Sequence, residues 1–160
     1  MLRQLLIIVI LFAFVSCKTT RYFVVRHAEK ESQNANMSSD VPLSVEGQKR
    51  AEAIKDQLMH QKIRAIYSTN YIRTKSTAQP LATAIGVPIE TYNPSDNSFV
   101  DNIKEMEKGN ILIVGHSNTV DDIVNKLMGE TVIASDLPDT EYGGLFIIRK
   151  KGKNFTFEKR

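Results

Sequence analysis

Residues 22–28 of this chain read Tyr-Phe-Val-Val-Arg-His-Ala, a short apolar run that stops abruptly at an arginine and a histidine. Four consecutive apolar residues are typical of a buried β-strand. The side chains of Arg26 and His27 would then stand at the C-terminal end of that strand, where α/β folds keep their ligand crevices. This stretch therefore predicts a strand of a central sheet and a site for chemistry at its end.

A second stretch repeats this arrangement later in the chain. Residues 111–114 are wholly apolar and are followed by Gly115 and His116. If the two strands are parallel neighbours, His27 and His116 lie about 5 to 10 Å apart at one edge of the sheet. The two histidines could then contact one small ligand.

Apolar segments of strand length alternate with segments of helical period along the chain, which is typical of an α/β domain with a mostly parallel central sheet. We expect strands at residues 21–26, 63–68, 87–92, 110–115, 144–149 and 154–157. We expect helices at residues 44–60, 71–85 and 97–108, and a fourth from just after His116 to near Gly129. Ser44 can cap the first helix, and Gly86 can end the second.

Length and charge limit the function classes. The 160 residues are enough for one globular domain with a real core. The net charge is only +3, and several basic residues gather near the C-terminus: Arg149, Lys150, Lys151, Lys153, Lys159 and Arg160. We interpret this run as a solvated turn between edge strands, with a docking patch for anionic lipids or polyanions as the alternative. We expect no nucleic acid and no obligate protein partner.

The first 16 residues differ from the rest. Arg3 precedes an apolar stretch over residues 5–15, which ends at Ser16 and Cys17. A basic start, an apolar core and a small residue before the break are the layout of a bacterial export signal, and the stretch is short for a membrane span. We expect residues 1–16 to be a signal peptide that is cleaved before Cys17, and residues 17–160 to form a single domain.

Cys17 is the only cysteine, so no intrachain disulfide can form. Residues 14–17 read Phe-Val-Ser-Cys and resemble the lipobox of bacterial lipoproteins, in which the cysteine is acylated. The resemblance implies an exported lipoprotein that is anchored to the membrane of the cell envelope through lipid on Cys17, facing the periplasm or the exterior. An ordinary cleaved signal and an uncleaved anchor are the alternatives.

Arginines near the histidines favour an anionic ligand. Arg26 adjoins His27, and Arg73 lies at the opening of the helix that follows residues 63–68. Guanidinium groups match the geometry of phosphate oxygens, and free N–H groups at a helix N-terminus attract the same anion. For Arg73 taken alone, a surface salt bridge is the simpler interpretation. A set of cationic residues and residues near a helix start could together bind phosphate: Arg26, Arg73, His116, Ser117 and Asn118.

Other chemistries fit the sequence poorly. Residues 115–119 read Gly-His-Ser-Asn-Thr and resemble a nucleophile elbow, but no histidine follows His116 to complete a serine triad. The chain has no HExxH motif, no cysteine pair and no third histidine near the other two, so we expect no metal. It also lacks a P-loop motif, and we expect no cofactor.

Four motifs in sequence resemble the histidine phosphatase superfamily, which has the phosphoglycerate mutase-like fold. They are Arg-His-Ala-Glu-Lys at residues 26–30, Leu-Ser-Val-Glu-Gly-Gln-Lys-Arg-Ala at residues 43–51, a segment over residues 67–78 that contains Arg73, and Ile-Val-Gly-His-Ser at residues 113–117. The resemblance covers nearly the whole chain after Cys17. It implies a three-layer α/β/α sandwich with a mostly parallel central sheet.

The resemblance also implies a reaction. His27 would be the nucleophile that takes the phosphoryl group, and Arg26, Arg73 and His116 would surround that group. Water would then release phosphate, so the protein would be a metal-independent phosphatase acting on small phosphorylated substrates, either monoesters or phosphoramidates. A phosphoglycerate mutase-type phosphotransferase and a non-catalytic phospho-ligand-binding module are the alternatives.

Two positions depart from the family's pattern. Ala28 stands where the family usually has glycine, so the backbone there must avoid positive φ. Ser117, rather than an acid, follows the second histidine, so no motif identifies the acid that protonates the leaving group. Asp96 is the first candidate, and Asp101 and Glu29 follow. A leaving group of low pKa, or one bonded through nitrogen, needs less help from an acid.

Overall fold

A six-stranded sheet forms the centre of the protein, with the strand order β3-β2-β4-β1-β5-β6. The computed structural model describes residues 19–32, 40–106 and 109–160. β1, β4, β2 and β3 pair in parallel, whereas β5 pairs antiparallel with both β1 and β6. The strands are β1 (Thr19–Arg26), β2 (Ile63–Ser68), β3 (Ile89–Thr91), β4 (Asn110–Gly115), β5 (Leu145–Lys151) and β6 (Asn154–Lys159).

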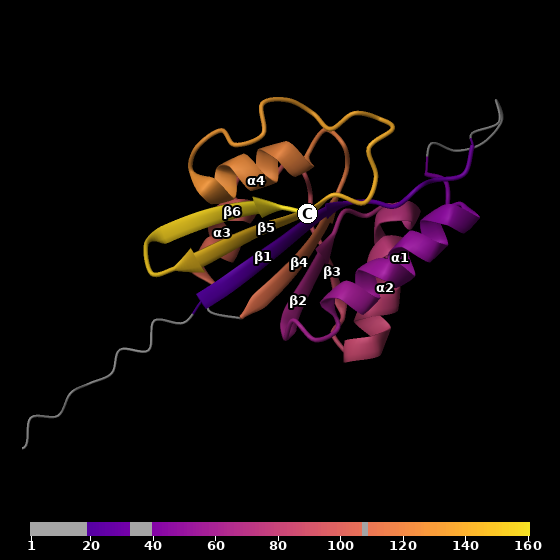
Figure 1. Cartoon of the computed structure of the whole chain (residues 1–160), viewed down its shortest axis with the longest axis horizontal. Helices are drawn as coiled ribbons and strands as arrows, with labels where there is room; N and C mark the ends of the chain where they lie inside the picture. The colour runs from indigo at the N-terminus through magenta and orange to yellow at the C-terminus, as the bar shows by residue number, and fades with distance from the viewer. Residues whose placement is uncertain (1–18, 33–39, 107–108) are drawn as a thin grey trace, which may run out of the picture.

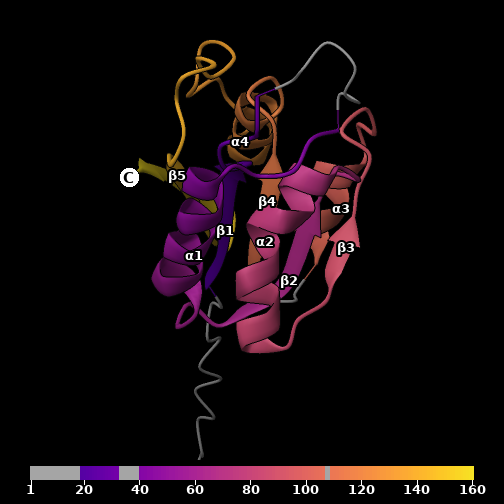
Figure 2. The same cartoon turned by 90° about the vertical axis from the view of Figure 1, so that its right-hand side faces the viewer.

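Helices cover both faces of the sheet. α1 (Val45–Leu58) and α2 (Ile72–Ile85) pack on one face, and α3 (Phe99–Glu105) and α4 (Val120–Met128) pack on the other (Figure 1). Figure 2 shows α1 and α2 side by side in front of the sheet. The predicted three-layer α/β/α sandwich with a mostly parallel central sheet is confirmed.

Alternation along β1 explains why this strand lies in the middle of the molecule. Tyr22 and Val24 point into the core beneath α3 and α4, while Phe23 and Val25 point into the core beneath α1 and α2. All four side chains are buried. A strand with apolar residues on both faces is stable only between two helical layers.

Two elements are shorter than predicted. The strand expected over residues 87–92 is reduced to β3, because the Val87 amide donates to the Ala82 carbonyl at the end of α2. The helix expected over residues 97–108 is reduced to α3, because Met106 adopts an extended backbone at φ −71° and ψ 122°. The basic run near the C-terminus forms a hairpin of β5 and β6, with Lys151 and Lys153 exposed at its turn.

The predicted signal peptide and Cys17 lie outside the described residues, so export and lipidation stay predictions. Within residues 19–32, 40–106 and 109–160, no helix is long and apolar enough to cross a membrane.

The start of α1 packs tightly on the segment that follows β1. Ser44 caps the helix by accepting a hydrogen bond from the Gly47 amide at 3.1 Å, and the Ser44 amide donates to the Glu29 carbonyl at 2.9 Å. A Cβ added at Gly47 would lie 2.0 Å from the Glu29 carbonyl oxygen. Only glycine allows the helix to approach this backbone so closely.

Replacing Gly47 by alanine is therefore expected to lower the free energy of unfolding by about 3 kcal/mol, because the added methyl group overlaps backbone atoms that cannot move independently. Urea denaturation followed by circular dichroism measures the loss. Gly86→Ala is the matched control, since Gly86 has φ 67° but open space around it, and it should cost only about 1 kcal/mol. Equal losses in the two variants would contradict the close packing of α1.

Candidate active site

The parallel pairing of β1 with β4 brings the two predicted histidines together. Arg26 lies opposite Gly115 in the register, so His27 and His116 are the next residues on neighbouring strands. The His27 amide donates to the Gly115 carbonyl at 2.9 Å, and the two imidazole centroids are 5.4 Å apart. Both side chains are buried, with 4% of His27 and 9% of His116 exposed.

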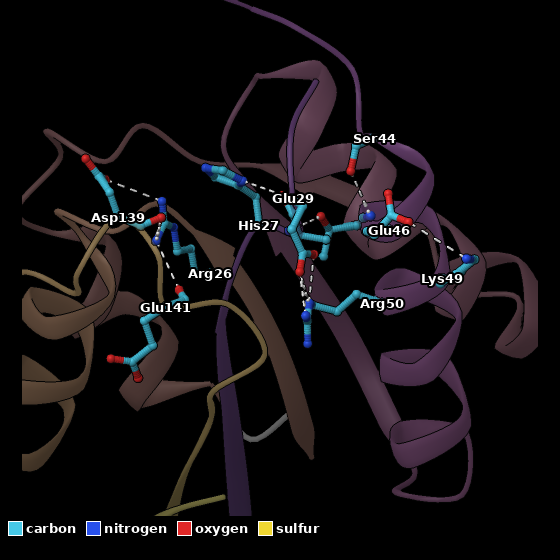
Figure 3. Close-up of polar contacts among 12 residues, drawn as sticks. Arg26, His27, Glu29, Ser44, Glu46, Lys49, Arg50, Asp139 and Glu141 are labelled. Carbon is cyan, nitrogen blue, oxygen red and sulfur yellow. Dashed lines mark hydrogen bonds and ion pairs between the residues drawn. The ribbon is translucent and has the colours of Figure 1, made fainter. Parts of the chain in front are cut away.

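A backbone carbonyl determines the tautomer of His27. Nδ1 lies 2.8 Å from the Ala28 carbonyl oxygen (Figure 3), and because a carbonyl only accepts, Nδ1 must carry the hydrogen. Burial lowers the pKa of His27 to about 4, and the positive charge of Arg73 contributes in the same direction. The ring is therefore neutral at pH 7, and its lone pair is on Nε2.

His116 has the opposite arrangement of nitrogens. Arg73 Nη2 lies 3.3 Å from Nδ1, which must accept because a guanidinium only donates. Nε2 then carries the hydrogen and donates to Thr69 Oγ1 at 2.8 Å, and the Thr69 hydroxyl in turn donates to Thr74 at 3.0 Å. Burial, followed by the charge of Arg73, lowers the pKa of His116 to about 4.

Arg73 reaches the histidines from the first turn of α2. Its side chain is only 13% exposed, and Nη1 lies 3.7 Å from Asp40 Oδ1. Thr77, one turn further along α2, accepts from the Ala28 amide at 2.9 Å and donates to the Arg73 carbonyl at 2.8 Å. This threonine ties the helix that supplies the arginine to the strand end that supplies His27.

Ala28 fits its position without strain. Of the residues that the structure describes, Lys62 is the one other than glycine with a positive φ, so the backbone at Ala28 avoids that region as expected. The Ala28 side chain is fully buried against Leu43 and Ala51.

Arg26 contacts the loop between α4 and β5. Its Nη1 donates to the carbonyl oxygens of Pro138, Asp139 and Glu141 at 2.8, 3.1 and 3.0 Å, and Nη2 lies 3.5 Å from the Asp139 carboxylate (Figure 3). Nε is buried and finds no hydrogen-bond acceptor within the described residues. A buried cationic donor of this kind is costly to leave unpaired, and an oxygen of a bound anion could satisfy it.

Asp96, the first predicted proton donor, makes its contacts elsewhere. Oδ1 accepts from the amide and the hydroxyl of Ser98 at 2.8 and 2.7 Å, just before α3, and the side chain is exposed. These hydrogen bonds lower the pKa of Asp96, so it is ionised at neutral pH and poorly suited to donating a proton.

The other two acids are paired with cations. Glu29 receives two hydrogen bonds from Arg50 Nε at 2.9 and 2.7 Å (Figure 3), and this contact lowers the pKa of Glu29. Asp101 Oδ2 lies 3.4 Å from Lys126 Nζ on the exposed surface between α3 and α4. The contacts described for Asp96, Asp101 and Glu29 therefore do not include either histidine.

The remaining predicted residues lie just before α4. Ser117 and Asn118 follow His116 directly, and the Ser117 carbonyl accepts from the Leu137 amide at 2.9 Å. Thr69 was not predicted, although it follows β2 as His27 follows β1, and its position at the same sheet edge is the signal that could have identified it. Among the described residues, no three His, Cys, Asp or Glu side chains are grouped so that they could bind one metal ion.

The family model of the histidine phosphatase superfamily (branch 1) matches residues 22–93. No curated protein matches the chain. SixA from Agrobacterium tumefaciens is a structural neighbour with 21% identity, a TM-score of 0.69, and 88% of this chain and 97% of that chain covered. The protein histidine phosphatase SixA in complex with tungstate has 19% identity and a TM-score of 0.68, with 86% of this chain and 94% of that chain covered. A mycobacterial glucosyl-3-phosphoglycerate phosphatase has 10% identity and a TM-score of 0.66, with 89% of this chain and 97% of that chain covered.

These solved structures show that the chain shares their fold over nearly their whole length. The family model adds a sequence match over residues that include Arg26, His27 and Arg73. His116 lies beyond the matched residues, and the pairing of β1 with β4 places it beside His27. The chain thus resembles the histidine phosphatase superfamily in sequence over residues 22–93, and it shares the fold of these solved structures.

Proposed function

We propose that this protein is a phosphatase that hydrolyses phosphate monoesters or phosphoramidates through a phosphohistidine intermediate on His27. The observation that carries the proposal is the buried, neutral His27, whose Nε2 lone pair lies in a site shared with Arg73 and His116. The family match supports a phosphohydrolase at a coarse level. Small phosphorylated compounds are the expected substrates.

The reaction proceeds in two displacements at phosphorus. In the first, the Nε2 lone pair attacks, the P–N bond to His27 forms and the bond from phosphorus to the leaving group breaks. In the second, water attacks the phosphohistidine, the P–N bond breaks and phosphate leaves with the oxygen of that water. At each transition state negative charge is spread over the three equatorial oxygens of the phosphoryl group. Arg73 and the Nε group of Arg26 are cationic donors fixed in advance, so they stabilise that charge with little reorganisation.

The leaving group either receives a proton from an acid in the site or departs without that help. Asp96, Asp101 and Glu29 all have other contacts, and the tautomer of His116 directs its hydrogen to Thr69. Leaving groups that need little assistance are therefore favoured, such as a phenolate or a nitrogen of a phosphorylated imidazole. One structural neighbour is a protein histidine phosphatase, which supports phosphoramidates as a substrate class.

Turnover by the purified full-length protein tests this function. We expect hydrolysis of phenyl phosphate and of phosphoimidazole in the presence of EDTA, and His27→Ala should lower kcat/KM by at least about 10³-fold because the nucleophile is lost. His60→Ala is the matched control, since His60 is exposed beyond the end of α1, and it should retain full activity.

Activity that is lost with EDTA and returns with a divalent metal would contradict the mechanism, as would an active His27→Ala variant. Tight binding of inorganic phosphate without turnover of either compound would instead indicate the phospho-ligand-binding module.

The low histidine pKa values have a consequence for pH dependence. Because burial lowers the pKa of His27 and His116 to about 4, the unfolded chain binds protons near pH 6.5 before the folded chain does. The stability that depends on these groups is thus fully present above pH 6.5 and is lost as the pH falls towards 4. An NMR titration of the imidazole Cε1–H signals, assigned with His27→Asn and His116→Asn, should give midpoints near 4. Midpoints near 6.5 would show that the histidines are not buried as described.

We also propose that the chain is exported and anchored at the cell envelope through lipid on Cys17. The layout of residues 1–16 and the lipobox-like residues 14–17 support this assignment. In a bacterium that processes lipoproteins, the chain should incorporate labelled palmitate and fractionate with membranes, and Cys17→Ser should abolish the label. Label retained by Cys17→Ser, or absent from the unmodified chain, would refute lipidation at Cys17.

A further inference from the structure

Four aromatic rings lie in succession across the site. The Tyr142 centroid is 6.2 Å from that of His27, the His27 centroid is 5.4 Å from that of His116, and the His116 centroid is 5.0 Å from that of Tyr71. The histidines are therefore the inner members of the series, and the tyrosines are the outer members. Tyr71 precedes α2, and Tyr142 belongs to the loop between α4 and β5.

Each tyrosine also covers one of the two arginines. Arg26 Cζ lies 4.3 Å from the Tyr142 ring centroid, and Arg73 Cζ lies 4.5 Å from the Tyr71 ring centroid. A guanidinium over an aromatic face is attracted to it, which holds both planes in place. The two tyrosine rings thus have defined positions relative to the groups that would bind phosphate.

The tyrosines are the part of this ring series that solvent reaches. Tyr71 is 38% exposed and Tyr142 is half-buried, whereas the two histidines are almost completely covered. In an in-line displacement the leaving group departs on the side of phosphorus opposite the attacking atom. Because His27 is buried at the edge of the sheet, that side faces the outer part of the site, where the tyrosines lie.

We infer that Tyr71 and Tyr142 are specificity-determining residues that contact the leaving group and favour one that is a planar aromatic ring. This inference rests on the proposed phosphatase function and adds the substrate class to it. Offset or edge-to-face contact with tyrosine stabilises a flat ring, such as a phenol or an imidazole, and an aliphatic alcohol cannot make the same contact. The shared chemistry is a phosphoryl group attached to a planar ring, either through oxygen or through nitrogen.

Comparison of three substrates with the full-length protein tests the inference. We measure kcat and KM for phenyl phosphate, phosphoimidazole and glycerol 2-phosphate. Tyr71→Leu and Tyr142→Leu, which keep an apolar side chain but lose the flat ring, should each lower kcat/KM for a ring substrate about three- to tenfold relative to glycerol 2-phosphate. The loss should appear mainly as a higher KM. Tyr71→Phe and Tyr142→Phe keep the ring and should retain the preference.

The readout is the ratio of kcat/KM between a ring substrate and glycerol 2-phosphate. A ratio is needed because each tyrosine contacts an arginine, so its removal also affects the rate for every substrate. A selective loss for phenyl phosphate supports the inference with aryl esters as the substrate class, and a selective loss for phosphoimidazole supports it with phosphoramidates. Equal losses for all three substrates, or a wild-type protein without preference for ring substrates, would overturn the inference while leaving the phosphatase function intact. A wild-type protein that turns over none of the three would overturn both.

Discussion

The parallel pairing of β1 with β4 is the constraint on which the candidate site depends. It places Arg26 opposite Gly115, so the two strands end side by side. His27 and His116, which directly follow these strands, therefore lie next to each other. The bond from the His27 amide to the Gly115 carbonyl extends this pairing by one residue into the site. α1 and α2 then pack against the segment that follows His27, through the close approach of Gly47 to Glu29 and through the hydrogen bond from Ala28 to Thr77.

Burial gives this geometry its chemical character. Two histidines beside two arginines would repel one another if they were protonated, and desolvation keeps both imidazoles neutral. The contacts of each ring then select different tautomers, with the lone pair on Nε2 of His27 and on Nδ1 of His116. The positive charge beside the imidazoles belongs to Arg26 and Arg73, which also contact the carboxylates of Asp139 and Asp40. A neutral imidazole beside fixed positive charge is consistent with the proposed phosphoryl transfer.

β1, β2, β4 and β5 could be predicted from the sequence because their apolar runs are clear, whereas only part of the strand expected over residues 87–92 forms, as β3. The positions of His27 and His116 follow from the ends of β1 and β4. The contacts of Arg26 could not be predicted, since they depend on the path of the loop between α4 and β5, which has no periodicity. For the same reason, the sequence did not indicate that Tyr142 lies beside His27. The sequence offers no pattern that distinguishes Asp96 as a proton donor from other carboxylates. Its hydrogen bonds to Ser98 depend on the fold of the loop before α3.

Detection of the covalent intermediate is the most direct test of the central claim. The full-length protein would be mixed with ³²P-labelled phosphoimidazole, denatured in alkali to preserve phosphoramidate bonds, digested, and mapped by mass spectrometry. A phosphoryl group on the peptide that contains His27, acid-labile and absent from His27→Asn, is the expected result. Turnover with no labelled protein at any time point, or label on His116 instead, would contradict the assignment of His27 as the nucleophile.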